Sequence, residues 1–346
     1  MTLPGFTIVG AGLAGTTLAW ALVRRGRAVR LIDREPPVTS SRIAAGLLTP
    51  ITGKKLSVSW RWHELRPAAE RFYRSIEAET GATFFRQRPI LRLFTSDAER
   101  MQFEERRATF GDLATPIDTP PEHVAMPFGG FAMPTAAQLD VWGYLDASRE
   151  WFRGRQIYER IPGTATGASG CDPLHPLPPV TVPETVTIHC TGYPPLPPFD
   201  AVRFRPAKGE ILTVCIPDLN ESRVINHGGF WVAPTTTPDV YRAGATYSWH
   251  ELDCKPTATG RAELEALLRE VVRLPFEVIG HDAAVRPIVE GRHPRIGLHP
   301  ADPAVGFFNG LSSKGSLTAP FFAEQFAAFL CGEGQIEPEV DVRGVF

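Results

Sequence analysis

The feature that most restricts how this chain folds is the glycine pattern GAGLAG at residues 10–15, which lies between an apolar strand and a helix. Hydrophobic periodicity predicts a strand over residues 6–9, a helix over 13–25 and a second strand over 29–32. A strand, GxGxxG, helix and strand in this order are typical of a dinucleotide-binding unit. In such a unit the phosphates meet the N–H groups at the start of the helix.

Each glycine of the pattern has a mechanical reason. Gly10 permits the tight turn after the strand, Gly12 lets a pyrophosphate approach the backbone, and Gly15 lets the helix pack closely on the strand. Asp33 follows about 20 residues later, where a carboxylate accepts hydrogen bonds from the adenosine ribose. The segment therefore predicts a bound dinucleotide, although the pattern alone does not separate NAD from FAD.

Two other interpretations of this apolar segment fail on its composition. A secretory signal would begin with basic residues, and MTLPG has none. A membrane-spanning helix needs about 20 apolar residues, whereas this run contains glycines and stops at Arg24 and Arg25. We therefore expect neither a signal peptide nor a membrane partner.

Composition excludes several further classes. The chain has 346 residues, enough for about two domains. Its net charge of −2, from 36 basic and 38 acidic residues, provides no field that would attract nucleic acid. The five cysteines lack a CxxC spacing and the nine histidines lack HExxH, so no metal site is expected. We expect buried thiols and a cytoplasmic location.

Three further segments accompany the glycine pattern and Asp33. They are SSRIAAGLLTP at 40–50, VTIHCTGY at 186–193 and VGFFNGLSSKGSLTAPFFAEQFAAFL at 305–330. In this order the four segments resemble the D-amino-acid oxidase family of FAD enzymes, which includes glycine oxidase and sarcosine oxidase. The resemblance covers nearly the whole chain. It implies non-covalent FAD, because the segment 286–297 lacks the cysteine that attaches the flavin in some members.

The resemblance also implies which residues hold the cofactor. Lys314 lies where a helix opens, and its cation would stabilise negative charge on a reduced flavin. The alternative for Lys314 is an ordinary solvated lysine. The implied cofactor residues are Gly10, Ala11, Gly12, Leu13, Ala14, Gly15, Asp33, Arg34, Ser41, Ala44, Ala45, Gly46, Leu47, Thr191, Gly192, Gly310, Leu311, Ser312, Ser313, Lys314 and Gly315.

The fold implied by the resemblance is α/β, with a Rossmann-like FAD-binding domain interleaved with a mixed-sheet α+β substrate domain. Residues 163–180 show no periodicity and are expected to form a surface loop. The implied FAD-binding domain comprises residues 1–80, 136–200 and 286–346, and the substrate domain comprises residues 81–135 and 201–285.

Two residues are candidates for the catalytic site. Arg286 lies in an apolar strand, where its charge requires a partner. In glycine oxidase-like relatives, an arginine in a matching RP context holds the substrate carboxylate through two parallel N–H···O bonds. The alternative is an ion pair with Asp282 or Glu290. Trp231, in FWVAP, matches an aromatic residue that lines the substrate site of glycine oxidases; its alternative is a core tryptophan.

The reaction that the resemblance implies is oxidation of a C–N bond in a small amino acid or secondary amine. The amine binds in its neutral form, and hydride moves from the carbon next to the carboxylate to flavin N5. Water hydrolyses the resulting imine, and dioxygen or another acceptor reoxidises the flavin. This scheme needs no protein base at the reacting carbon, and the sequence contains no convincing pair of histidine and glutamate for one.

Three other functions remain open at this point. GLSSKGSLTAP is also similar to the oxidase half of the bifunctional enzyme that modifies the carboxymethylaminomethyl group of the tRNA wobble uridine. Arg86, Arg88 and Arg92 form a modest basic strand, but the acidic net charge disfavours RNA. The others are a nicotinamide-dependent dehydrogenase and a flavin-bearing binding module without turnover. The sequence does not determine the oligomeric state.

Overall fold

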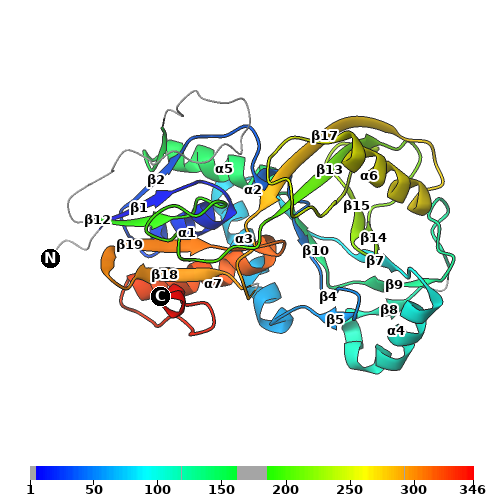
Figure 1. The fold of residues 1–346 in the computed structure, drawn as a ribbon, viewed down its shortest axis with the longest axis horizontal. Helices are drawn as coiled ribbons and strands as arrows, with labels where there is room; N and C mark the ends of the chain where they lie inside the picture. The colour runs from blue at the N-terminus through cyan, green and yellow to red at the C-terminus, as the bar shows by residue number, and fades with distance from the viewer. Residues whose placement is uncertain (1–4, 118, 162–184, 292) are drawn as a thin grey trace.

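The computed structural model describes residues 5–117, 119–161, 185–291 and 293–346 (Figure 1). The loop predicted at 163–180 lies outside these residues. Two large sheets organise the molecule, one toward each end of its long axis in Figure 1.

The first sheet has six strands in the order β11-β2-β1-β12-β19-β18. All neighbours pair in parallel except β18 with β19, which are antiparallel. The register aligns Val9 with His189 and His189 with Phe307, so three strands end at one edge of the sheet. The strands are β1 (Gly5–Val9), β2 (Val29–Asp33), β11 (Tyr158–Arg160), β12 (Thr185–His189), β18 (Arg295–His299) and β19 (Asp302–Asn309).

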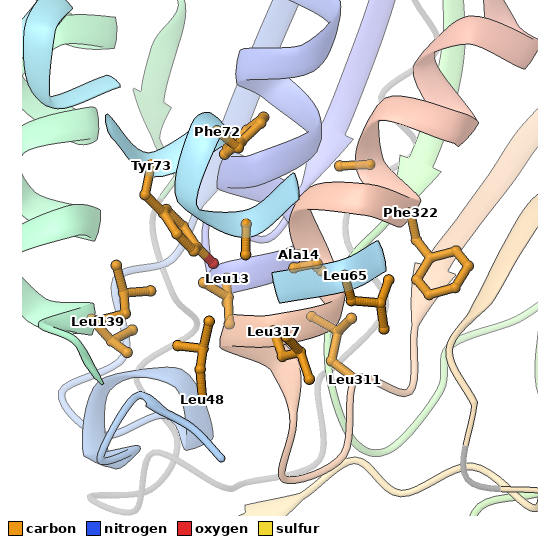
Figure 2. Packing of buried hydrophobic residues seen from close by; sticks show 14 of the residues in the cluster. Leu13, Ala14, Leu48, Leu65, Phe72, Tyr73, Leu139, Leu311, Leu317 and Phe322 are labelled. Carbon is orange, nitrogen blue, oxygen red and sulfur yellow. The ribbon is translucent and has the colours of Figure 1, made fainter. Parts of the chain in front are cut away.

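Apolar helices cover this sheet. In α1 (Leu13–Val23) the residues from Leu13 to Leu22 are buried, because this helix carries small and apolar residues on every side. It packs on α5 (Val141–Arg153) and on α7 (Gly315–Leu330), and α7 packs on α3 (Trp62–Thr80). Figure 2 shows this core, with Leu13, Ala14, Leu48, Leu65, Phe72, Tyr73, Leu139, Leu311, Leu317 and Phe322.

The second sheet has eight strands in the order β17-β13-β16-β15-β14-β7-β9-β8. It is mixed, because β14 pairs with β7 in parallel while the other neighbours are antiparallel. Its strands are β7 (Ile90–Leu93), β8 (Thr115–Pro116), β9 (Gly130–Met133), β13 (Ala207–Cys215), β14 (Val224–His227), β15 (Phe230–Pro234), β16 (Val240–Gly244) and β17 (Glu277–Arg286).

One face of the second sheet is covered by α6 (Ala258–Val271). Leu264 and Leu268 of this helix share a core with Leu212 and Val214 of β13. Because side chains alternate along a strand, Ile211 points to the opposite face, which remains available for a site. A Rossmann-like sheet and a mixed sheet joined by several chain crossings confirm the predicted fold class.

The remaining elements lie outside the two large sheets. The strand β10 pairs with β3 and β6, and β4 pairs with β5. The helix α2 begins after Thr39, whose side chain accepts a hydrogen bond from the N–H of Arg42. These elements are α2 (Ser40–Ile43), β3 (Leu47–Leu48), β4 (Ile51–Thr52), β5 (Ser57–Val58), β6 (Phe85–Gln87), α4 (Asp97–Phe110), η1 (Gly111–Leu113), β10 (Ala137–Leu139) and η2 (Val342–Val345).

The cysteines follow the expectation of buried thiols only in part. Cys190 is free and buried, whereas Cys215 and Cys331 are free and half-buried. Cys254, in contrast, is disulfide-bonded. The sequence offered no sign of this because scattered cysteines do not reveal which of them lie close in space.

The close packing of α1 on β1 predicts the effect of Gly15→Ala. A Cβ at this position would lie 1.9 Å from the carbonyl oxygen of Gly10. Although alanine is the better helix former, we expect the free energy of unfolding to fall by about 1–3 kcal/mol, because backbone atoms must move. Denaturant unfolding measures this change.

Gly344→Ala is the matched control, because a Cβ there meets no atom within 4 Å. Its unfolding free energy should stay within about 0.5 kcal/mol of the wild-type value. If Gly15→Ala were as stable as this control, the close approach of helix and turn would be wrong.

Candidate cofactor and substrate site

A cavity of about 860 Å³ separates the carboxyl edge of the six-stranded sheet from the free face of the eight-stranded sheet. Its walls include the turns that follow β1, β12 and β19. The predicted site residues that line it are Gly10, Gly12, Leu13, Ala14, Asp33, Arg34, Ser41, Ala44, Ala45, Gly46, Leu47, Thr191, Gly192, Trp231, Arg286, Leu311, Ser312, Ser313, Lys314 and Gly315.

Three predicted cofactor residues lie behind the cavity wall instead of on it. Ala11 donates its N–H to the carboxylate of Asp33 at 2.6 Å. Gly15 holds the helix close to the turn, and Gly310 adopts a positive φ of 78° where a Cβ would collide with Val289. These three residues shape the turns on which the cavity-lining residues lie.

The first turn leaves the start of α1 open toward the cavity. Gly10 has a φ of +101°, and Gly12, which precedes the helix, has no side chain of its own to cap it. The N–H of Leu13 donates to Ser41 Oγ at 3.0 Å, and a Cβ on Gly12 would meet the same oxygen. The absence of a Cβ and the positive end of the helix make a cradle that fits a phosphate group.

Asp33 closes β2 beside this cradle. Its two carboxylate oxygens accept the N–H groups of Ala11 at 2.6 Å and Glu35 at 2.5 Å. A carboxylate has further lone pairs, so these bonds leave acceptor capacity for ribose hydroxyls. The ribose contact itself stays a prediction.

Glu35 is a site residue that the sequence reasoning missed. It lines the cavity, and Tyr158 donates a hydrogen bond to it at 2.8 Å. Burial opposes ionisation of Glu35, but Tyr158 and the arginines Arg149, Arg153 and Arg160 hold the pKa of this carboxyl below its usual value. No short sequence pattern predicts this cluster, because its members come from three separate segments of the chain.

The second and third turns are tied together. Asn309 donates its side-chain N–H to the carbonyl oxygen of Gly192 at 2.7 Å. Lys314 precedes α7, and its ammonium lies 3.3 Å from Thr52 Oγ1 and 3.2 Å from Ser59 Oγ. Burial lowers the pKa of Lys314, and none of the described residues places a carboxylate within ion-pair distance of it. It is therefore a cavity-lining amine and not a solvated one.

Arg286 ends β17 on the opposite wall. Both ion-pair partners that were considered for it are engaged elsewhere: Asp282 lies 3.5 Å from Arg242, and Glu290 lies 2.6 Å from Arg205. In the described chain, the guanidinium instead donates to the carbonyl oxygen of Thr246 at 3.3 Å. Burial lowers the pKa of Arg286, as expected for a charge removed from water without an anion beside it.

Trp231 lies on β15 and faces the same cavity. It is partly buried and packs against Ile43, Ile211 and Ala284, so it is both part of a small core and part of the wall. Tyr247, which follows β16, also lines the cavity and is 46% exposed.

Comparison with known structures shows that the overall fold is shared with other proteins. Glycine oxidase from Bacillus cereus ATCC 14579 matches with a TM-score of 0.76 at 16% identity, over 96% of both chains. Iminodiacetate oxidase from Chelativorans sp. BNC1 matches with a TM-score of 0.73 at 19% identity, over 96% of this chain and 97% of that one. These matches show that the fold is shared.

Sequence comparison adds a relative and a family. The tRNA 5-methylaminomethyl-2-thiouridine biosynthesis bifunctional protein MnmC from Psychrobacter sp. (strain PRwf-1) is 38% identical over 72 residues, which is 20% of this chain. The alignments with curated relatives each span less than a third of the relative's length, and only 10% for MnmC. A model of the DAO family, described as FAD dependent oxidoreductase, matches residues 6–329. The chain therefore belongs to the DAO family of FAD-dependent oxidoreductases.

Proposed function

We propose that the enzyme binds FAD non-covalently and oxidises a C–N bond next to a carboxylate in a small amino acid or secondary amine. The observation that carries this proposal is Arg286, a partly buried cation that lines the cavity with no carboxylate partner among the described residues. Such a cation is suited to a carboxylate supplied by the substrate.

We assign the cofactor to the wall made by the six-stranded sheet. The start of α1 would hold the pyrophosphate, Asp33 the ribose, and Lys314 the electron-rich side of the flavin. Burial raises the pKa of the Cys190 thiol, which also lines the cavity, so this cysteine stays protonated and is a poor candidate for covalent attachment. The proposed FAD-binding domain comprises residues 1–80, 136–200 and 286–346, and the proposed substrate domain comprises residues 81–135 and 201–285. Arg286, the last residue of β17, lies at the boundary between them.

The substrate would lie against the eight-stranded sheet. Arg286 would fix its carboxylate, and Trp231 would form an apolar wall that orients the rest of the molecule. When bound, FAD supplies the acceptor for the two electrons of the oxidation. The imine product is then hydrolysed by water, and dioxygen or another acceptor takes up the electrons.

The charges on the cavity wall favour an uncharged amine. Among the described residues that line the cavity, the carboxylates are Asp33 and Glu35, and both belong to the end of β2. The substrate wall therefore provides no anion to stabilise an ammonium group and no carboxylate to act as a base. We infer that the amine enters in its neutral form.

A tRNA substrate is the second candidate, because of the local identity with MnmC. The basic strand that suggested it does not form a basic surface: Arg92 is 3% exposed and pairs with Glu99 at 2.5 Å, while Arg88 donates to the carbonyl oxygen of Pro234.

The family is FAD-dependent, so the nicotinamide alternative is set aside. No helix in the described part of the chain has the length and apolarity to span a bilayer. We propose a cytoplasmic location.

If Arg286 binds the substrate carboxylate, Arg286→Ala should strongly reduce the activity of the enzyme. Two charge-assisted hydrogen bonds are lost, so kcat/KM should fall by about 10²- to 10⁴-fold, with Arg286→Lys in between. Peroxide release, or dye reduction under nitrogen, is measured against glycine, sarcosine, proline and D-amino acids.

Arg205→Ala is the matched control, because Arg205 is an exposed arginine paired with Glu290 outside the cavity. It should keep wild-type activity. Equal activity of Arg286→Ala and Arg205→Ala would contradict the proposed carboxylate site.

The pH dependence of kcat/KM tests whether the substrate amine enters the site in its neutral form. We expect kcat/KM to rise with pH until the substrate amine is deprotonated, because the ammonium form finds no anion on the substrate wall. The midpoint should therefore follow the amine pKa from one substrate to another, for example from sarcosine to proline. A midpoint that is the same for all substrates would instead indicate a base on the protein.

The tRNA alternative is tested by a gel shift with bulk tRNA at several salt concentrations. With Arg92 paired to Glu99 and a net charge of −2, we expect no retardation at physiological salt. A salt-sensitive shift together with inactivity on every small amine would favour the RNA substrate.

A further inference from the structure

The backbone after β16 is paired with β13 beyond the end of the named strand. Lys208 and Ser248 exchange two backbone hydrogen bonds, of 2.8 and 3.0 Å. Two residues along, the N–H of Glu210 donates to Thr246 Oγ1 at 2.9 Å, and the N–H of Thr246 donates back to the Glu210 carbonyl at 3.3 Å. This pairing places Tyr247 directly opposite Gly209.

An ion pair between the buried Lys208 and the partly exposed Asp253 also holds this segment. The ammonium of Lys208 lies 2.6 Å from the carboxylate of Asp253, and only 2% of the Lys208 side chain is exposed. Asp253 also accepts the N–H of Lys255. The segment that carries Tyr247 is therefore held at both ends, at the paired backbone and at Asp253.

The guanidinium of Arg286 lies across Gly209 and reaches this segment. A Cβ on Gly209 would lie 2.1–2.4 Å from three of the guanidinium atoms, so any other residue here would displace the guanidinium from this position. In this position, the Arg286 Cζ lies 4.1 Å from the centre of the Tyr247 ring. At this distance an aromatic ring attracts a cation through its negative face.

We propose that Tyr247 is a positioning residue, which holds the Arg286 guanidinium so that its edge, and not its face, meets the substrate carboxylate. This inference rests on the proposed function. An arginine side chain has many rotamers, and a bidentate bond to a carboxylate requires one orientation of its plane. The guanidinium carbon lies over the Tyr247 ring and Thr246 accepts one of the guanidinium N–H groups. In the proposed arrangement, the remaining N–H groups are left for the ligand.

The test compares Tyr247→Leu, Tyr247→Phe and the control Trp249→Leu. Trp249 is 60% exposed and lies beside Tyr247, so its replacement reports on loss of a neighbouring aromatic alone. The probes are acetate and its uncharged counterpart acetamide, and their Kd values are read from the change in the flavin absorbance spectrum of the holoenzyme. Bound FAD and the melting temperature show that each variant is folded.

We expect Tyr247→Leu to raise the Kd of acetate by about 2- to 30-fold, the range of a cation–π contact. The Kd of acetamide should not change, and the KM of the amino acid should rise by the same factor as the Kd of acetate. Tyr247→Phe keeps the ring and should bind acetate as the wild type does. Trp249→Leu should also bind like the wild type.

Two failures are distinguishable. If Arg286→Ala leaves the acetate Kd unchanged, the proposed carboxylate site itself is wrong. If Arg286→Ala abolishes acetate binding while Tyr247→Leu binds like the wild type, Arg286 holds the carboxylate without help and only the role of Tyr247 is overturned. Equal weakening by Tyr247→Leu and Tyr247→Phe also overturns it, because the ring would then not be the group that matters.

Discussion

The parallel pairing of β1 with β12, and of β12 with β19, is the constraint on which the whole site depends. Parallel strands in register end at one edge of a sheet, so residues that are far apart in the chain are brought to one place. The hydrogen bond from Asn309 to Gly192 then ties two of the turns to each other. One cavity can therefore be lined by the first, middle and last segments of the chain.

The charged side chains that line the cavity differ in whether they already have a partner of opposite charge. Arg92 and Arg160 line the cavity, but each has a carboxylate within reach, Glu99 for the first and Glu35 for the second. Arg286 lines the cavity without one among the described residues, and it is partly buried. An unpaired cation in a poorly solvated place gains most from an anion that arrives with a ligand. The proposal that Arg286 binds a substrate carboxylate rests on this difference in pairing as well as on geometry. Lys314 also lines the cavity without a carboxylate partner among the described residues, but it belongs to the wall assigned to the cofactor.

Much of this arrangement was predictable from sequence because its signals are local. A GxGxxG between a strand and a helix, or an arginine inside an apolar strand, is visible in a few consecutive residues. The predicted lining residues Gly12, Lys314, Trp231 and Arg286 do face one cavity. Contacts between separate segments were not predictable. The arginine cluster around Glu35 depends on where β11 and α5 pack, which no short pattern encodes.

Three consecutive residues of β13 show how one strand serves both sides of the sheet. Lys208 and Glu210 point away from the cavity face on which Gly209 lies, because side chains alternate along a strand. Lys208 anchors Asp253, and Glu210 accepts two hydrogen bonds from Thr257, the residue that caps α6. Gly209, between them, leaves the space that the Arg286 guanidinium occupies. A substitution at 208 or 210 would therefore act on the substrate wall through the loop and helix it anchors, whereas one at 209 would displace the arginine directly.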